Sequence, residues 1–186
     1  MDSLKNLRAK IKDELIQNDL YFSIPAGSTV EKNSIIRVRE DKNQNNESKI
    51  ILSYKSPNVL REGVETREEI EVQVLSNVPT LVQLLGKLGM KPLVTVTKKR
   101  VEYSLIYKGV HLTVTLDKVE TLGSFTEIEL MSDRRDDAKK LIELGEELAA
   151  KLSLDKTKKI SLGYHEMMLE KSVARDSPSD IRKDSY

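Results

Sequence analysis

Short segments of the chain alternate apolar and polar residues with a period of two, which is the side-chain period of a β-strand. In residues 35–39, Arg37 and Arg39 share one face while Ile36 and Val38 share the other. Charged residues occupy one face of each further segment of this kind, at 49–55, 67–74, 94–102, 110–117 and 125–130. The pattern predicts about six strands, each with one charged and one apolar face.

Other segments have the longer period of an amphipathic helix. Roughly the first dozen residues are predicted to form a helix, because apolar residues recur with a helical period at Leu4, Leu7, Ile11 and Leu15. This helix is expected to lead into a strand near residues 17–22. Three more helices are predicted, over residues 77–89, 133–152 and 161–171. The polar composition of residues 172–186 predicts a disordered tail. We therefore expect one domain, over residues 1–171.

The charged strand faces can be arranged in two ways. An antiparallel sheet with one face in water explains any single charged strand face. Several such strands, together with helices whose apolar stripes need a partner, favour a rolled sheet. If the helices cover its apolar outer face, the charged faces point inward. We expect an α+β fold, a closed or nearly closed antiparallel β-barrel with helices packed outside.

Composition narrows the classes of function. The 186 residues include 31 Lys and Arg against 30 Asp and Glu, a formal net charge of +1, which argues against a broad nucleic-acid groove. The chain has no cysteine, so it has no disulfides or thiolate chemistry, and a cytoplasmic location is expected. No run approaches the ~20 apolar residues of a membrane span, so we expect no membrane partner.

Basic residues on the predicted inner faces indicate a bound anion. They are Arg37, Arg39, Lys55, Arg67, Lys98 and Arg100. Two like charges ~4 Å apart repel by about 4 kcal/mol at an effective dielectric constant of 20, so a counter-charge must offset them. Arginine matches phosphate oxygens with two parallel hydrogen bonds, and lysine adds a point charge. The set predicts a binding site for a chain of phosphates.

Acidic residues on the same faces indicate a metal. Carboxylates beside phosphate repel it unless a hard cation lies between them, and magnesium or manganese binds in this way. The predicted metal ligands are Asp117, Glu127 and Glu129, with Glu69 and Glu71 as supporting acids. Arg–Glu ladders between strands would explain any one of these residues without a ligand. A structural role is favoured over catalysis for His111 and His165, so no catalytic base is assigned.

Several segments follow one another in the order of a known family. They are an Arg-x-Arg at 37–39, Lys-Ser-Pro at 55–57, Arg-x-Glu-x-Glu at 67–71, Lys-x-Arg at 98–100 and an acidic run at 116–129. Together they resemble the CYTH family, the triphosphate tunnel metalloenzymes, with Ser56 in place of the motif glycine. Residues 161–169 resemble the Ser-Tyr-x-Glu-Leu-Leu ending of its class IV adenylyl cyclase branch, with Leu162 and Gly163 inserted.

The resemblance, over roughly residues 16–170, implies an eight-stranded antiparallel tunnel that binds a triphosphate with magnesium or manganese. It implies a class IV adenylyl cyclase, which converts ATP to cyclic AMP and pyrophosphate. A triphosphatase acting on thiamine triphosphate or inorganic triphosphate uses nearly the same parts and is the first alternative.

One motif of the family does not occur in the sequence. The first strand of the family carries Glu-x-Glu-x-Lys, which supplies two metal ligands and a phosphate-binding lysine, and this chain has no such motif. Either its start is truncated or part of the metal site is lost. A non-catalytic polyphosphate-binding module is therefore the second alternative. A barrel with one strand fewer would leave two unpaired edges, which a homodimer would cover.

Overall fold

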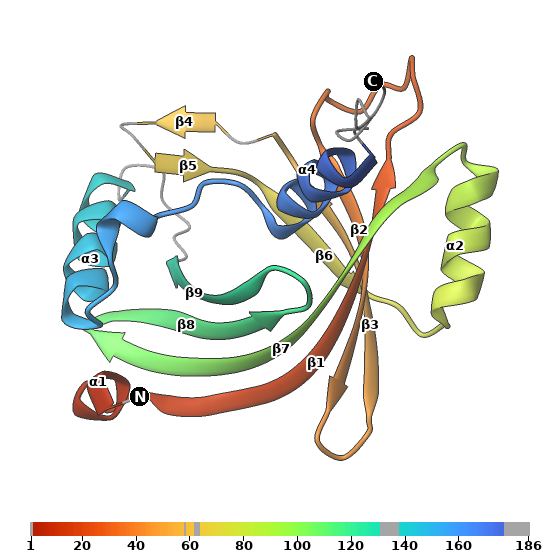
Figure 1. The fold of residues 1–186 in the computed structure, drawn as a ribbon. Coiled ribbons are helices and arrows are strands. Elements are labelled where there is room, and N and C mark those ends of the chain that lie inside the picture. The colour runs from red at the N-terminus through yellow and green to blue at the C-terminus, as the bar shows by residue number, and fades with distance from the viewer. Residues whose placement is uncertain (1, 58, 62–63, 131–137, 177–186) are drawn as a thin grey trace, which may run out of the picture.

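The computed structural model describes residues 2–57, 59–61, 64–130 and 138–176, and most of its strands form one sheet (Figure 1). The strand order is β6-β3-β2-β1-β7-β8-β9, and all neighbours are antiparallel. The strands of this sheet are β1 (Lys10–Ser23), β2 (Ile35–Asn43), β3 (Ser48–Lys55), β6 (Glu69–Gln73), β7 (Lys91–Tyr107), β8 (Val110–Val119) and β9 (Gly123–Leu130). A separate pair is formed by β4 (Val59–Arg61) and β5 (Val64–Thr66).

The sheet is strongly curved, and we call its concave face the trough (Figure 1). Within the described residues, edge strands β6 and β9 do not pair with each other, so the barrel is nearly closed. This confirms the predicted α+β architecture. The helices are α1 (Asp2–Asn6), α2 (Val78–Lys87), α3 (Ala138–Lys151) and α4 (Tyr164–Asp176), with a 3-10 turn at Lys156–Lys158.

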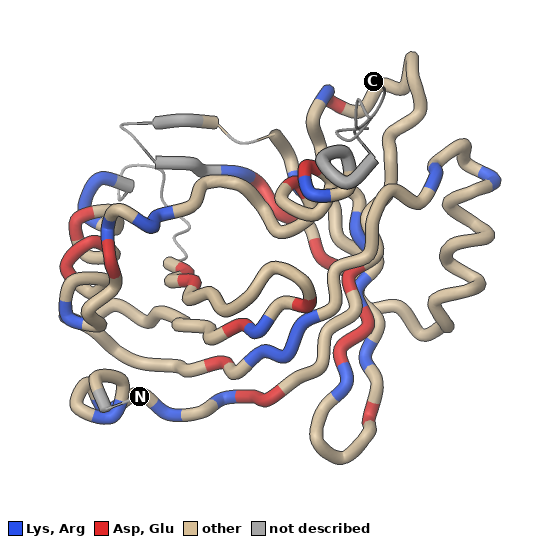
Figure 2. The backbone as a smooth tube through the Cα atoms, viewed as in Figure 1, with Lys and Arg blue, Asp and Glu red and all other residues tan. Residues whose placement is uncertain are grey.

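Strand register gathers the charged residues on the trough. Residues that pair directly across two strands point to the same face of a sheet. Asp19 pairs with Arg39 on β2, and Arg100 on β7 pairs with Asp117 on β8. Figure 2 shows acidic and basic positions following one another along these central strands. The two-residue alternation in the sequence therefore predicted the charged face correctly.

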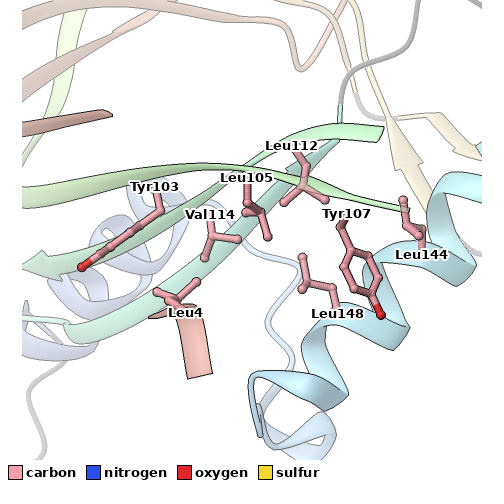
Figure 3. Packing of buried hydrophobic residues seen from close by; sticks show 8 residues of the cluster. All are labelled: Leu4, Tyr103, Leu105, Tyr107, Leu112, Val114, Leu144 and Leu148. Atoms are coloured by element: carbon pink, nitrogen blue, oxygen red, sulfur yellow. The ribbon is translucent and has the colours of Figure 1, made fainter. Parts of the chain in front are cut away.

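Helices α1, α2 and α3 cover the opposite, apolar face. Helix α2 packs Leu81 and Leu85 onto Phe22, Val38 and Ile50 of β1–β3. Helices α1 and α3 cover the far ends of β7 and β8, where eight buried side chains form a cluster (Figure 3), namely Leu4, Tyr103, Leu105, Tyr107, Leu112, Val114, Leu144 and Leu148. No helix in the described part of the chain is long and apolar enough to cross a membrane.

The N-terminal segment differs from its prediction. Helix α1 ends at Asn6, Arg8 has a left-handed φ of 56°, and the chain is a strand from Lys10 onward. The pattern of Ile11 and Leu15 looked helical, but Ile11 is 57% exposed. Strand β1 pairs with β7 along its whole length, and this tertiary pairing overrides the local helical period.

The other helices lie close to their predicted positions. Asn77 caps α2 by accepting a hydrogen bond from the Thr80 amide at 2.9 Å, and Gly89 follows the helix with a φ of +84°. Helix α3 begins at Ala138, and the preceding predicted residues 133–137 lie outside the described residues. Helix α4 continues to Asp176, and the rest of the predicted tail lies outside the described residues.

Candidate functional site

The centre of the trough is a carboxylate bound by cations of two neighbouring strands. Asp19, fully buried on β1, accepts hydrogen bonds from Arg39 Nε at 2.6 Å and Arg39 Nη2 at 2.8 Å. Lys98 Nζ on β7 donates to it at 2.7 Å, and Arg37 Nη1 lies 3.8 Å away. Burial raises the pKa of Asp19, but Arg39, Lys98 and Arg37 outweigh it and hold that pKa far below its usual range.

Arg37 has unused hydrogen-bonding capacity. Its Nη2 donates to Ser53 Oγ at 3.2 Å and to Glu71 Oε1 at 2.9 Å. Its Nε is buried and has no hydrogen-bond partner. Because an unpaired buried donor costs about 1–3 kcal/mol, the side chain is suited to an additional acceptor such as a phosphate oxygen.

A second basic group lies on β3 and just before β6. Lys55 Nζ and Arg67 Nε each donate to Glu69 Oε1 at 2.8 Å. Burial, with Arg37 and Arg67 nearby, lowers the pKa of Lys55 to about 8, although Glu69 opposes the change. Burial likewise lowers the pKa of Lys98 to about 8, with Asp19 opposing. Both lysines would hold their protons more firmly if an anion entered the trough.

Arg100 connects the three predicted metal ligands. Its Nε donates to Asp117 Oδ1 at 2.8 Å, and its Nη2 contacts Asp117 Oδ2 and Glu127 Oε2, each at 2.5 Å. Glu129 Oε1 lies 3.7 Å from Arg100 Nη1. The structure therefore brings Asp117, Glu127 and Glu129 together around one guanidinium. Among the described residues, no group of three or more acidic, histidine or cysteine side chains is arranged to hold a metal ion.

Two of these acids nevertheless fit a cation. Glu127 and Glu129 lie on the same face of edge strand β9, where both are partly exposed. Burial, Glu127 and Glu102 raise the pKa of Glu129, while Arg100 lowers it. A raised carboxyl pKa means that added positive charge would stabilise the ionised form. Glu127 and Glu129 could therefore contribute oxygen ligands to a hard cation such as magnesium or manganese.

Helix α4 reaches the same group of residues. Tyr164, its first residue, donates its hydroxyl to Asp117 Oδ2 at 3.0 Å, and its ring packs on Phe125. Lys98 Nζ lies 5.7 Å from the centre of the Tyr164 ring. Tyr164 thereby fixes the start of α4 against the trough.

Sequence reasoning found the trough cations and the acids of β6, β8 and β9, but it missed Asp19, Gln17 and Tyr164. The signal for Asp19 was present, because Gln17, Asp19 and Tyr21 alternate with Asn18, Leu20 and Phe22. Gln17 is buried and donates to Asp41 at 2.9 Å. Tyr164 could not have been found from spacing, because it is 47 residues from Asp117 in the chain.

Fold and site define an antiparallel β-trough that concentrates buried cations. The CYTH domain model matches residues 1–164, so the chain belongs to the CYTH domain family. A candidate adenylate cyclase of Methanocaldococcus jannaschii is 28% identical over 167 residues, covering 90% of this chain and 89% of that protein.

Solved structures agree with this assignment. The PH1819 protein of Pyrococcus horikoshii is 30% identical, with a TM-score of 0.79 over 91% of this chain and 92% of that one. A second Pyrococcus horikoshii protein, PH1012, is 27% identical, with a TM-score of 0.70 and 89% of both chains covered. The fold of this chain is therefore shared with these proteins.

Proposed function

We propose that this protein binds a triphosphate in the trough together with a divalent metal and acts as a class IV adenylyl cyclase. The observation that carries the proposal is an excess of buried cations. Among the described residues four cationic side chains are buried, and they are Arg37, Lys55, Lys98 and Arg100. Only two carboxylates are equally buried in that set, Asp19 and Asp117. An anion in the trough would remove this imbalance.

The basic side chains have distinct roles in this proposal. Arg37, with its unpartnered Nε, donates hydrogen bonds to one phosphate group, and Lys55 and Arg67 neutralise the phosphates beside it. Lys98 and Arg39, which both contact Asp19, bind the middle phosphate of the triphosphate. Fixed positive charges of this kind stabilise the negative charge that builds up on a leaving pyrophosphate.

The proposed metal site lies at the edge strand. Glu127 and Glu129 would hold magnesium or manganese there, with Asp117 behind them and fixed by Arg100 and Tyr164. A bound divalent ion supplies charge that polarises the reacting phosphate. In cyclisation the ribose 3′-oxygen would bond to the α-phosphorus as the bond to the pyrophosphate oxygen breaks, and the hydroxyl proton would pass to solvent. The similarity to the candidate adenylate cyclase of Methanocaldococcus and the class IV-like C-terminal motif support cyclisation.

The test measures binding and chemistry separately. Tripolyphosphate without metal should raise the melting temperature, because a ligand at a hundred times its Kd adds about 2.7 kcal/mol to the free energy of unfolding. Arg37→Gln should reduce this shift, whereas Arg8→Gln, at an exposed residue, should leave it unchanged. The absence of any shift with tripolyphosphate or ATP at low salt would contradict the proposal.

Product analysis then distinguishes the activities. With ATP and either metal, a cyclase releases cyclic AMP and pyrophosphate in equal amounts. Orthophosphate released from tripolyphosphate or thiamine triphosphate, with no cyclic AMP from ATP, would identify a triphosphatase instead. Binding without any product would identify a non-catalytic polyphosphate-binding module.

A further inference from the structure

His165, the second residue of α4, lies on the trough beside the phosphate-binding cations. Its imidazole stacks on the ring of Tyr21 with 4.5 Å between ring centres and 12° between the planes. Tyr21 is buried and pairs directly with Arg37 across β1 and β2. Because paired residues share a face, the imidazole lies next to the arginine whose Nε is unpartnered. The proposed triphosphate site thus has an additional side chain that can carry a proton.

The surroundings of His165 are mainly cationic. The titratable and charged groups that face it from α4, β1, β2, β3 and the segment before β6 are Glu166, Tyr21, Arg37, Lys55 and Arg67. The acids that form ion pairs with these surrounding cations are Asp19, Glu69 and Glu71. Burial lowers the pKa of His165. The nearby cations Arg67, Lys55 and Arg37 lower this pKa further, and Glu166 opposes the change. The imidazole is therefore mainly neutral at neutral pH while the trough lacks an anion.

The inserted residues before α4 leave the space that this imidazole ring occupies. A Cβ atom on Gly163 would lie 2.9 Å from both Nδ1 and Cε1 of His165, which is too close for any larger residue unless the ring moves. The Gly163 amide donates to Glu166 Oε2 at 2.7 Å, which closes the first turn of α4. The inserted Leu162-Gly163 pair therefore lets the imidazole lie back against Tyr21.

We propose that His165 is an additional ligand of the bound triphosphate, at the end of the site beside Arg37 and Lys55, and that it takes up one proton from solvent as the anion binds. The inference rests on the proposed triphosphate-binding function. A phosphate group among the three cations reverses the local field, so it favours the imidazolium, which donates hydrogen bonds from both ring nitrogens. The only bond change is the new N–H bond that the imidazole forms with a solvent proton, and no bond to phosphorus forms or breaks.

The affinity for the anion depends on pH because protonation of His165 and binding of the anion favour each other. The anion raises the pKa of His165 above its depressed value in the free protein. Protonation then strengthens binding fully at pH values below the free-state pKa, and this contribution is lost as pH rises through the bound-state pKa. Each unit of difference between the two pKa values corresponds to about a tenfold change in affinity.

Histidine NMR tests the inference directly, because the chain has only two histidines, His111 and His165. Imidazole-labelled protein is titrated over about pH 5 to 8, with and without saturating tripolyphosphate. His111→Gln assigns the two sets of signals. We expect tripolyphosphate to raise the pKa of His165 by about 1–3 units and to leave His111, which is exposed on β8, unchanged.

Two variants complete the test by calorimetric titration with tripolyphosphate. His165→Gln should bind about tenfold or more weakly than the parent at the low end of this pH range and equally at the high end. Gly163→Ala displaces the ring of His165 without removing it, so it should reduce the gain in tripolyphosphate affinity at low pH. His111→Gln should retain that gain in affinity. If tripolyphosphate binds but the pKa of His165 does not rise, this inference fails alone. If tripolyphosphate does not bind at all, the proposed function fails with it.

Discussion

Asp19 shows how one residue makes the basic site compatible with folding. It is fully buried, and it binds Arg39 through two hydrogen bonds and Lys98 through one. Buried cations without a partner are strongly destabilising, so the trough needs this carboxylate whenever no anion is bound. The residue that balances the site is as important to it as the cations themselves.

The first prediction concerns Asp19→Asn. Removing one partner of a buried ion pair costs about 3–5 kcal/mol, so we expect the free energy of unfolding in urea to fall by about this amount at neutral pH. The depressed pKa of Asp19 means that its stabilisation is present above the unfolded-state value and is lost as pH falls, so the variant should lose less stability in acid than the parent. Tripolyphosphate should stabilise the variant more than the parent. Equal stability of the two proteins at neutral pH would contradict this role.

The second prediction concerns the two lysines whose pKa values are lowered to about 8. A bound anion raises these values, so above about pH 8 the protein must take up protons to bind ATP, and the affinity should fall by up to about tenfold per pH unit per lysine. ATP is a suitable probe because its phosphates are fully ionised in this range. Calorimetry should show a shallower slope for Lys55→Arg, which keeps its charge. An unchanged slope would exclude Lys55 from the site.

At the scale of elements, strands were easier to predict than their ends. The alternation of Arg37 and Arg39 with Val38 identified β2 and its charged face, because side-chain direction in a strand depends only on local geometry. The start of β1, around Ile11 and Leu15, was mistaken for helix, since its apolar spacing suits a helix and its strand conformation depends on pairing with β7, far away in the sequence. The contact of Tyr164 with Asp117 depends on how α4 docks, which no local pattern encodes.

The cap of α2 gives a prediction for a single helix. Asn77 Oδ1 accepts hydrogen bonds from the Thr80 amide and hydroxyl, each at 2.9 Å. Asn77→Ala should lower the free energy of unfolding by about 1 kcal/mol, measured in urea. The control is Asn45→Ala, in the exposed turn between β2 and β3, which should have little effect. A loss as large in the control would show that the effect is not one of capping.

Strand β9 gives the corresponding prediction for chemistry. The double change Glu127→Gln and Glu129→Gln removes the two carboxylates proposed to hold the metal, so metal-dependent turnover of ATP should be abolished. Anion binding should persist, since the cations are intact, and tripolyphosphate melts would measure it. Glu120→Gln with Glu143→Gln, at exposed positions, is the matched control. Turnover equal to the parent in the first variant would rule out β9 as the metal site.

At the scale of the whole molecule, the described strands form one continuous sheet whose edge strands, β6 and β9, do not pair with each other. The cations proposed to bind the ligand are spread over β2, β3 and β7, on both sides of β1, so a bound triphosphate would connect the two walls of the trough. Hydrogen exchange should therefore slow on both the β2–β3 and the β7–β9 side when tripolyphosphate binds, because the ligand stabilises only the folded form. Protection limited to one side would show that the ligand does not span the trough.

The ion pair between Asp19 and Arg39 also bears on how fast a ligand leaves. Asp19 is part of the chain, so its effective concentration at Arg39 far exceeds that of any dissolved anion. A phosphate that contacts Arg39 competes with this resident carboxylate, and its binding is an exchange of one anion for another. The carboxylate returns as soon as the phosphate moves away, which favours rapid dissociation. If the proposed cyclase activity holds, a strongly basic trough of this kind would still release its pyrophosphate product before the next turnover.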